Sequence, residues 1–312
     1  MVIAMSRELA ILLATYNGGK YIRELLDSIL LCRHLDSLCL YIRDDGSTDN
    51  TVEILGQYEL EHKHLIYKFI GKNIGTSQGF NFLLKESLAG EHSFFMFADQ
   101  DDKWIKNKVD IVMKCLEAGD FNVPKLVHSD LYVVNENLEV ISKSFWHYQR
   151  LNPENIDINR LLIQNVITGC TIGMNRKLAE LAYPIPKEAI MHDWWIGLTA
   201  SAFGTIEAIN EPLIYYRQHG SNTIGAHKYS MSMKKVKEKF VISKYTRQAE
   251  AFYSEFFERL DEKQRETLKA FISLSSVNRI EAVRLILSHS FFKNGVIRNM
   301  GFFIKILFQK RI

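Results

Sequence analysis

The stretch Phe94–Trp104, FFMFADQDDKW, contains the pattern that decides the fold. Its first half, Phe94–Ala98, is a short apolar run that is typical of a strand buried on both faces. Three carboxylates follow at once, on Asp99, Asp101 and Asp102. Carboxylates at the end of a buried strand are costly unless a cation meets them. The stretch therefore predicts a buried strand that ends at an acidic ligand site.

The spacing of these carboxylates indicates a metal site. In an extended segment, residues two apart point to the same side, so we expect Asp99 and Asp101 to converge. Oxygen ligands suit a hard divalent ion, and Mg²⁺ is usually held by one or two carboxylates plus substrate phosphates. Open α/β sheets also bind ligands beyond the carboxyl ends of their strands. The alternative is an acidic turn in which Asp102 caps a helix that starts near Trp104.

Composition limits the class of protein. The chain has 312 residues, enough for one large domain or for one domain with an appendage. Its 47% hydrophobic and 24% charged residues are those of an ordinary globular protein. We expect no signal peptide and no membrane-spanning segment, because no apolar run is long enough and free enough of charge. Four cysteines without CxxC spacing predict reduced thiols in the cytosol.

Charge is distributed unevenly along the chain. Residues 1–225 contain 21 Lys and Arg against 28 Asp and Glu, whereas residues 226–312 contain 18 against 8. Two parts with different roles are therefore expected, with a boundary between residues 225 and 226. The second part is basic, and its partner should be anionic.

Strand and helix patterns alternate four times in the first part, with short connections. Strands are expected over 9–15, 38–42, 65–70 and 94–98, and helices over 21–31, over about 50–60 and up to residue 88. Such alternation predicts a mainly parallel, doubly wound α/β sheet. Neither GxGxxG nor GxxxxGK[ST] occurs, so neither a dinucleotide fingerprint nor a P-loop is supported.

Later segments extend this sheet. Further strands are expected over 125–134, 167–174, 205–209 and 213–217, and helices from 175 to about 182 and from about 191 to 202. Residues 135–165 are irregular and aromatic, which indicates a loop with a short helix. From about residue 231 onward the pattern is helical throughout.

A second acidic run, DDGSTD at Asp44–Asp49, follows the expected strand over 38–42. A DG turn and capping of the next helix explain Gly46 to Asp49. They do not explain two adjacent Asp residues at the carboxyl end of a strand, which is where a ligand is expected.

Eight stretches, taken together, match one family. They are ATYNGGKYI, IRDDGSTDNT, GKNIGTSQGFN, FADQDDKW, LVHSD, TGCTIGMNRK, HDWW and YRQHGSN. Their order and spacing over residues 8–223 resemble the inverting GT-A glycosyltransferases of family 2. The combination of a DQDD-type loop with HDWW and YRQHG is most similar to bacterial rhamnosyltransferases that build cell-wall and surface polysaccharides. The resemblance implies a GT-A catalytic domain over 1–225, a nucleotide-sugar donor and a bound Mg²⁺ or Mn²⁺.

The same resemblance assigns residues to the donor. Asp45 corresponds to the carboxylate that accepts a hydrogen bond from a pyrimidine N3–H, with Asp44 as a second candidate. Asp101 corresponds to the metal-binding carboxylate of the DxD motif, and Asp99 to a ribose or metal ligand. His219 matches a position at the diphosphate or metal, although a structural loop histidine is the alternative. The other implied donor-site residues are Ala14, Thr15, Tyr16, Asn17, Asn73, Gly75 and Gln100.

Asp193, in HDWW, corresponds to the catalytic base. Inverting transfer is a single in-line displacement in which the acceptor hydroxyl loses a proton as it attacks. A carboxylate opposite the leaving diphosphate can take that proton. The alternative role of Asp193 is to cap the helix that it opens.

Other functions remain open on sequence alone. The same fold could use a UDP-hexose instead of dTDP-L-rhamnose. A nucleotidyltransferase could also use paired carboxylates on a parallel sheet, but it would want a more basic loop than TYNGGKY near the first strand. A non-catalytic sugar-binding module would not need a metal set and a base. We expect a polysaccharide or lipid-linked saccharide acceptor and no nucleic-acid partner.

The basic tail predicts contact with a membrane surface. Lysines crowd Met231–Lys244, and Phe291–Ile312 combines bulky apolar residues with Lys and Arg and contains no acid. Such a helix suits the interface plane of an anionic leaflet, which would place the protein on the cytoplasmic face of the cell membrane. The alternatives are packing on the catalytic domain and a homodimer interface.

Overall fold

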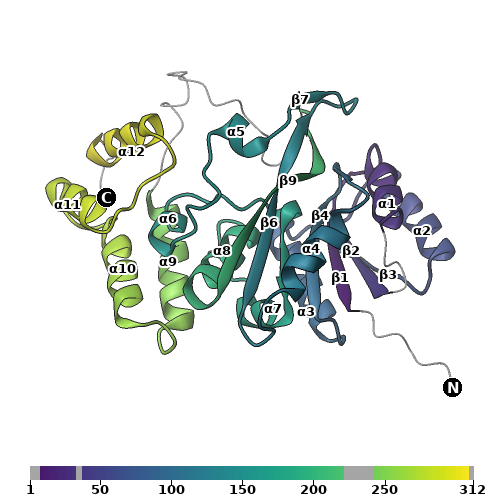
Figure 1. Cartoon of the computed structure of the whole chain (residues 1–312), viewed down its shortest axis with the longest axis horizontal. Coiled ribbons are helices and arrows are strands. Elements are labelled where there is room, and N and C mark those ends of the chain that lie inside the picture. Colours follow the sequence, from purple (N-terminus) through teal and green to yellow (C-terminus); the bar gives the residue numbers. More distant parts are fainter. Residues whose placement is uncertain (1–7, 33–36, 221–241, 309–312) are drawn as a thin grey trace. The chain divides into compact units, whose positions relative to one another are not determined.

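The computed structural model describes residues 8–32, 37–220 and 242–308, and the chain divides into two compact units (Figure 1). The first unit comprises Met1–Phe145, Ile167–Ile185 and Met191–Ala226, and the second comprises Trp146–Val166, Pro186–Ile190 and His227–Ile312. The boundary that the charge distribution predicts, between residues 225 and 226, lies outside the described residues, as do the part of Met231–Lys244 before residue 242 and residues 309–312. Two interior segments that lie before that boundary belong nevertheless to the second unit.

Four parallel strands form one half of the sheet in the first unit. They are β1 (Leu9–Thr15), β2 (Leu38–Asp44), β3 (Ile66–Ile70) and β4 (Phe94–Asp99), in the spatial order β3-β2-β1-β4. The connecting helices are α1 (Ile22–Leu30), α2 (Thr51–Glu61) and α3 (Thr76–Leu88). The alternation read from the sequence is therefore confirmed: β1, β2 and β4 are buried strands, whereas β3, at the edge of the sheet, is buried only at Ile66.

The other half of the sheet is mixed. It contains β8 (Gly173–Asn175), β6 (Lys125–Val134), β9 (Thr205–Arg217), β5 (Lys103–Trp104) and, beside β6, β7 (Val140–Ser142). Strand β8 runs antiparallel to both β4 and β6, and β9 runs parallel to β6. In the described part of the chain, the nine strands of the sheet lie in the order β3-β2-β1-β4-β8-β6-β9-β5, and β7 pairs with β6 outside this path. This arrangement confirms a mainly parallel α/β fold.

Two strand predictions were wrong in detail. The strand expected over 167–174 is a 3₁₀ turn, Gly169–Thr171, followed by the short β8. The two strands expected over 205–209 and 213–217 are the single strand β9, whose pairing with β6 shifts register between Ile209 and Pro212. A proline cannot donate to the ladder, and an irregularity at that point lets the strand continue past it.

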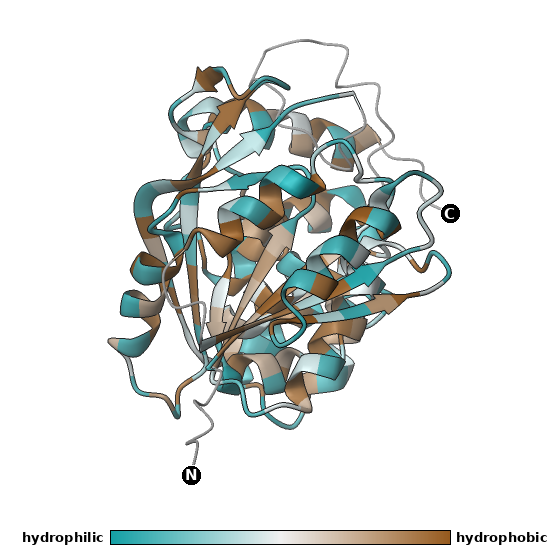
Figure 2. Ribbon diagram, turned by 90° about the vertical axis from the view of Figure 1, so that its right-hand side faces the viewer, coloured by the Kyte–Doolittle hydropathy of each residue, from teal (hydrophilic) through white to brown (hydrophobic). Residues whose placement is uncertain are grey.

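The core of the first unit lies along the central strands. Leu9 to Leu13 of β1 and Phe95 to Ala98 of β4 are at most 2% exposed. Figure 2 shows hydrophobic residues along strands in the middle of the view and both hydrophilic and hydrophobic residues on the helices around them. Helices α4 (Lys108–Glu117), α7 (Arg176–Ala182) and α8 (His192–Phe203) complete the cover. The strand ends are thus held rigidly by packing, so the side chains that follow them have fixed positions.

The second unit is helical. It contains α6 (Ile158–Leu161), α9 (Ile242–Phe256), α10 (Glu262–Ser273), α11 (Arg279–Ser288), α12 (Val296–Phe308) and most of α5 (Phe145–Gln149). Hydrogen bonds explain why the interior segment Trp146–Val166 joins this unit. The Asn294 side chain accepts from the Asn152 N–H and from the Asn155 side-chain amide. The Asn159 side-chain amide donates to the His289 carbonyl. Within the described ranges, none of the helices has both the length and the apolar character needed to cross a bilayer.

We predict that Gly204→Ala destabilises the protein. Gly204 ends α8, and a Cβ there would overlap the backbone carbonyl oxygen of Pro124, which also accepts a hydrogen bond from Thr205. Overpacking of this kind typically costs about 1–3 kcal/mol. Thermal unfolding followed by circular dichroism would measure the loss.

The control for this substitution is Gly301→Ala in α12, where a Cβ meets nothing within 4 Å. A helical Gly→Ala change should leave stability equal or raise it by up to about 1 kcal/mol. Equal melting temperatures for the two variants would contradict the steric argument.

Candidate active site

The carboxyl ends of three neighbouring strands meet at one edge of the sheet. In the ladder register, Ala14 of β1 lies between Arg43 of β2 and Asp99 of β4, and Thr15 lies beside Asp44. The two acidic runs of the sequence therefore lie on opposite sides of β1, one at the end of β2 and the other at the end of β4. This edge is where a ligand of an open α/β sheet binds.

The loop after β1 is tied to the loop after β2. The Asn17 N–H donates to Ser47 Oγ at 2.8 Å, and Asn17 Oδ1 accepts from the Thr48 N–H at 2.8 Å. Asn17 has a φ of 51°, a backbone conformation that asparagine tolerates better than most residues. Tyr16 beside it is 46% exposed. The two loops therefore form one wall, on which the tyrosine ring is accessible to a ligand.

Gln100 ties the acidic loop to the same wall. Its Oε1 accepts from the Thr15 hydroxyl at 2.6 Å and from the Tyr16 N–H at 2.9 Å, and its Nε2 donates to the Tyr16 carbonyl at 3.1 Å. Both ends of the amide are thus used within the protein. Gln100 accordingly sets the distance between β1 and the acidic loop.

Asp44 is fully buried and is committed to its own turn. Its carboxylate accepts from the Gly46 and Ser47 N–H groups and from the Ser47 hydroxyl. All three donors belong to that turn, and because the side chain is 0% exposed a ligand does not reach its remaining acceptor site. The second candidate for base recognition is therefore occupied by the DGST turn.

Asp45 joins two loops. It accepts from Arg43 Nε at 3.0 Å and from the N–H groups of Ile74 and Gly75 at 3.1 and 3.0 Å. Gly75 has a φ of +82°, which favours glycine, and its N–H also reaches the Asn73 side chain. A carboxylate has about four acceptor sites, so three donors leave one for a ligand N–H.

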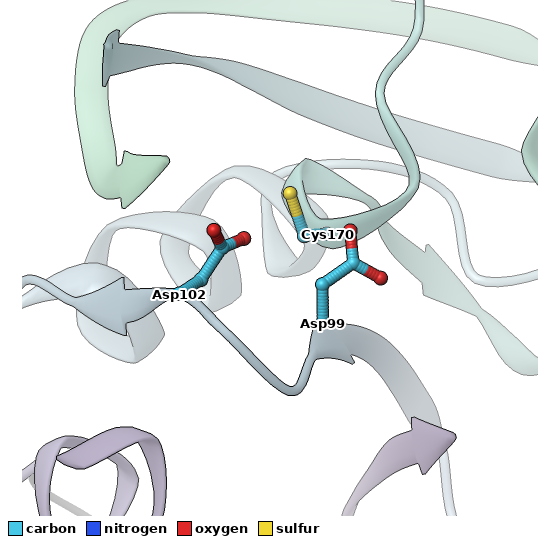
Figure 3. Close-up of side chains that lie close together, drawn as sticks. All are labelled: Asp99, Asp102 and Cys170. Atoms are coloured by element: carbon cyan, nitrogen blue, oxygen red, sulfur yellow. The ribbon is translucent and has the colours of Figure 1, made fainter. Parts of the chain in front are cut away.

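The acidic loop brings together a different set of carboxylates from the one expected. Residues 100–101 form a turn, and the Asp102 N–H donates to the Asp99 carbonyl at 3.3 Å. As a result Asp99 and Asp102, not Asp99 and Asp101, face one another beside Cys170 (Figure 3). The extended geometry that predicted convergence of Asp99 and Asp101 is absent there. The capping alternative for Asp102 is also wrong, since α4 begins only at Lys108.

Burial makes this group of side chains hard to ionise. Burial first, and the charge of Asp101 second, raise the pKa of Asp99 to about 7. The same causes raise the pKa of Asp102, whose Oδ1 accepts from the Arg217 N–H while Oδ2 has no hydrogen-bond partner in the described part of the chain. Burial also raises the pKa of the Cys170 thiol. Additional positive charge would stabilise this cluster.

Asp101 contacts His219 instead. His219 Nε2 lies 2.7 Å from Asp101 Oδ2, and both side chains are largely buried. The His219 ring also packs against Tyr21, with ring centroids 5.1 Å apart. Two residues 118 positions apart in the chain, both candidate metal ligands, are thus brought into direct contact.

Arg217 was not predicted, and it organises the acidic loop. Its Nε donates to the Asp101 carbonyl at 2.9 Å, and its guanidinium pairs with Glu24 and lies 4.5 Å from the centre of the Tyr21 ring. Because the same residue also donates its N–H to Asp102, it fixes both sides of the turn. Its position two residues before His219, within YRQHG, was the available signal.

Lys108 is a second residue that was missed. Its ammonium is fully buried, donates to the Cys170 carbonyl at 2.7 Å and lies 3.5 Å from the centre of the Trp104 ring. Burial lowers its pKa to about 8, against the opposing pull of Asp99 and Asp102. The Lys108 ammonium therefore places a positive charge beside the acidic cluster. The sequence around Lys108 shows only the pattern of a helix start, so this role could not be read from it.

Asp193 lies in the first turn of α8, whose N-cap is Met191, so the capping alternative was wrong. Its Oδ2 accepts from the Gly169 N–H at 3.1 Å, and Oδ1 has no hydrogen-bond partner in the ranges described. Burial, with a contribution from the Asp99 charge, raises the pKa of Asp193 to about 7. A carboxylate with one anchored and one unpartnered oxygen and such a pKa is suited to take up a proton near neutrality.

The His192 ring packs against Gly169, the residue whose N–H donates to Asp193. The same ring is buried against Phe80 and Phe97, with ring centroids 4.1 and 5.3 Å away, and burial lowers its pKa to about 3. The ring is therefore neutral. A Cβ on Gly169 would lie only 2.8 Å from His192 Nε2, so the imidazole packs directly under the residue that donates to Asp193.

The donor set fits a divalent ion. Asp101 supplies carboxylate oxygens and His219 an imidazole nitrogen, a combination that suits Mn²⁺ and tolerates Mg²⁺. The unpartnered Oδ2 of Asp102 and the raised pKa of Asp99 show a local deficit of positive charge. Cys170 fits less well, because a thiol with a raised pKa is a poor ligand for a hard cation.

The chain is similar in sequence to known glycosyltransferases. Residues 10–181 match the family Glycosyl transferase family 2. The chain is 27% identical over 233 residues to the dTDP-rhamnosyl transferase RfbG of Shigella flexneri, covering 69% of this chain and 74% of that protein. It is 26% identical over 231 residues to the putative teichuronic acid biosynthesis glycosyltransferase TuaG of Bacillus subtilis, covering 72% and 84%.

A solved structure is similar over most of the fold. The crystal structure of S. aureus TarS 1–349 in complex with UDP-GlcNAc aligns with a TM-score of 0.58 at 15% identity, covering 90% of this chain and 80% of that one. At this identity the likeness concerns the fold, which is GT-A. The family match covers more than half of the residues of this chain. The chain therefore belongs to glycosyl transferase family 2 and is a glycosyltransferase.

Proposed function

We propose that the protein is a metal-dependent, inverting glycosyltransferase that moves L-rhamnose from dTDP-L-rhamnose to a cell-wall or surface polysaccharide, or to a lipid-linked precursor of one. The observation that carries the proposal is the buried Asp193 carboxylate, with its raised pKa, in the same unit as the Asp101–His219 pair. A base for the acceptor hydroxyl and a cation site for the diphosphate are the two parts that a metal-dependent inverting transfer uses.

Asp193 is the proposed base. The attacking hydroxyl must lose a proton as its oxygen bonds to the anomeric carbon, and Asp193 Oδ1 is available for that proton. The Gly169 N–H holds the other oxygen, so the carboxylate keeps its orientation while its charge changes. A single displacement then inverts the configuration at that carbon.

Asp101 and His219 would hold the cation, with Asp99 and Asp102 nearby. Such an ion stabilises the charge of the departing diphosphate. Arg217 orients the loop that carries Asp101, and Gln100 orients the loop against β1. The remaining acceptor site of Asp45 would receive the imide N–H of a pyrimidine base.

The choice of donor rests on similarity to RfbG, which is named as a dTDP-rhamnosyl transferase. The DQDD, HDWW and YRQHG stretches of this chain support the same choice. Thymine and uracil present the same imide edge to Asp45, so the base contact does not separate the two classes of donor. A UDP-hexose is therefore the competing candidate.

The acceptor determines where the enzyme works. TuaG is named as a putative glycosyltransferase of teichuronic acid biosynthesis, and the resemblance of this chain to polysaccharide glycosyltransferases implies a polysaccharide or lipid-linked acceptor. We accordingly propose a peripheral location on the cytoplasmic face of the cell membrane. The basic character of residues 226–312 supports this location.

The variant Asp193→Asn tests the base. It should leave donor affinity near normal and reduce turnover by roughly a hundredfold or more, because the amide keeps the hydrogen bond from Gly169 but cannot take a proton. Donor binding by calorimetry and turnover by sugar release would be measured separately. A parallel loss of both would indicate a structural role.

The pH dependence follows from the same carboxyl group. Since the ionised form is the base and the pKa is about 7, kcat/KM of the wild type should fall as the pH drops below 7. Burial disfavours the ionised form, so folding stability should be lost as the pH rises from about 4 to 7, at up to about 1.4 kcal/mol per unit. Asp193→Asn has no buried charge at this position. Its midpoint of unfolding should therefore lie at a higher denaturant concentration than that of the wild type at pH 8, and at a similar concentration at pH 4.

The variant Asp101→Ala tests the metal site. It should weaken Mn²⁺ binding, followed by electron paramagnetic resonance, and lower transfer by roughly a hundredfold, because charge on the leaving group is worth several kcal/mol. Glu117→Ala removes one exposed acid from α4 and is the matched control. Full activity of Asp101→Ala, or of the wild type in excess chelator, would refute metal dependence.

Competition between donors tests the rhamnose assignment. When dTDP-L-rhamnose and UDP-hexoses are offered together with Mn²⁺, turnover of the rhamnosyl donor should exceed that of the others by at least about tenfold, the scale that one or two altered pocket contacts supply. Nuclear magnetic resonance of the released sugar would identify it. Exclusive turnover of UDP-hexoses would eliminate the rhamnose assignment and leave the family assignment intact.

A further inference from the structure

The start of α1 packs against the segment that follows β9. The ring of Tyr21, the N-cap residue of α1, lies against the His219 imidazole, with ring centroids 5.1 Å apart and an angle of 33° between the two planes. The Arg217 guanidinium lies over the same tyrosine ring, 4.5 Å from its centre. Arg217 donates to the Asp101 carbonyl, and His219 lies at the Asp101 carboxylate. One ring thus contacts two residues that reach Asp101.

Strand pairing ends before His219. The ladder between β6 and β9 runs as far as the pair of Val134 with Arg217, where β9 ends. One residue further on, the Gln218 N–H still donates to the Val134 carbonyl at 2.9 Å. His219 lies beyond this point, so the orientation of its imidazole depends on side-chain contacts. The Tyr21 ring provides one such contact.

Other residues of α1 hold the acidic loop from the same side. Glu24 pairs with Arg217 and, at 3.3 Å, with Lys103. The Ser28 hydroxyl oxygen accepts from the Trp104 N–H at 3.0 Å. These two residues and the N-cap tyrosine are spaced three and four positions apart, so they lie on one side of the helix. This side of α1 therefore supports both the acidic loop and the end of β9.

The positive charges around the tyrosine ring have acidic partners. Lys20 Nζ lies 4.8 Å from the centre of that ring and pairs with Glu136 at 2.7 Å. Arg217 pairs with Glu24. Because each of these cations has an acid beside it, their repulsion of a further cation is reduced. The negative charge of Asp101 is therefore able to attract a metal ion despite these neighbours.

We propose that Tyr21 is a positioning residue for the cation site, and that its ring sets the orientation of the His219 imidazole and the position of Arg217. The proposal rests on the proposed function, in which Asp101 and His219 hold a divalent ion. A ring that packs against an imidazole does not compete for its nitrogen atoms, and Nε2 lies 2.7 Å from Asp101 Oδ2. Loss of a residue that orients a metal ligand typically lowers metal affinity by about 10–100-fold.

The backbone of Tyr21 has a separate role at the start of α1. Its N–H donates to the Gly18 carbonyl at 3.0 Å, and its carbonyl accepts from the Leu25 N–H at 3.2 Å. Its side chain makes no capping hydrogen bond to the helix in the described part of the chain. The substitution Tyr21→Ala therefore keeps the hydrogen bonds that begin the helix and removes the ring.

The test is Mn²⁺ binding by the full chain, without donor or acceptor. Electron spin echo spectra of the wild type at saturating Mn²⁺ should show coupling to a directly bonded nitrogen, and His219→Ala supplies the reference spectrum without it. In Tyr21→Ala we expect the affinity for Mn²⁺ to fall by about 10–100-fold and the nitrogen coupling to decrease. Tyr21→Phe keeps the ring, so it should keep the coupling and an affinity within about twofold of the wild type.

The matched control is Tyr67→Ala in β3. Tyr67 is 46% exposed, and its ring stacks on Tyr41 with centroids 4.9 Å apart. This change removes the same side chain from another ring contact, so it should alter thermal stability but leave Mn²⁺ affinity within about twofold of the wild type. Thermal unfolding would show which variants are folded. Tyr21→Leu fills much of the lost volume without a ring and replaces Tyr21→Ala if that variant does not fold.

Three results would overturn the proposal. Tyr21→Ala could bind Mn²⁺ with the affinity and nitrogen coupling of the wild type, or Tyr67→Ala could weaken binding as much as Tyr21→Ala does. Either result would leave the proposed metal-dependent transfer intact. Thirdly, the wild-type spectrum could match that of His219→Ala, which would remove His219 from the cation site. Because this third result is seen in the wild type alone, failure of the proposed cation site is distinguishable from failure of the role of Tyr21.

Discussion

The structure depends on one constraint, which is the placing of several carboxyl groups in a low-dielectric environment near the carboxyl edge of a packed sheet. Each buried carboxyl group must be hydrogen-bonded, paired or protonated. Asp44 receives backbone donors from its own turn, and Asp45 receives Arg43 and the backbone of the next loop. Asp99, Asp102 and Asp193 receive less, and their pKa values are raised in consequence.

The number of hydrogen bonds that a carboxylate receives distinguishes carboxylates that hold a loop in place from those that are candidates for a chemical role. A carboxylate whose acceptor sites are filled by the protein shapes a loop, as Asp44 does. A carboxylate that retains a buried oxygen without a hydrogen bond is held at a cost in stability, and such a group is a candidate for a functional role. Asp102 Oδ2 and Asp193 Oδ1 are such atoms among the described residues, and they lie in the acidic loop and at the proposed base.

The sequence could predict what depends on local pattern. Alternating apolar runs predicted the four parallel strands, which the structure confirms, and the motifs singled out Asp101, His219 and Asp193, whose roles stay predictions. It could not predict which carboxylates meet, because this depends on the turn at residues 100–101, nor that Arg217 and Lys108 would serve the acidic loop from distant elements. The membership of residues 146–166 in the helical unit rests likewise on long-range hydrogen bonds to residues 289–294.

The proposed base and the acidic loop are linked electrostatically. The Asp99 charge is one of the causes that raise the pKa of Asp193. Neutralisation of Asp99, by a proton or by a cation at the acidic loop, removes that contribution and favours the ionised form of the base. Asp193 is therefore readiest to accept a proton when the acidic loop carries compensating positive charge. In the proposed mechanism, binding of the donor with its cation would thus be coupled through charge to activation of the acceptor.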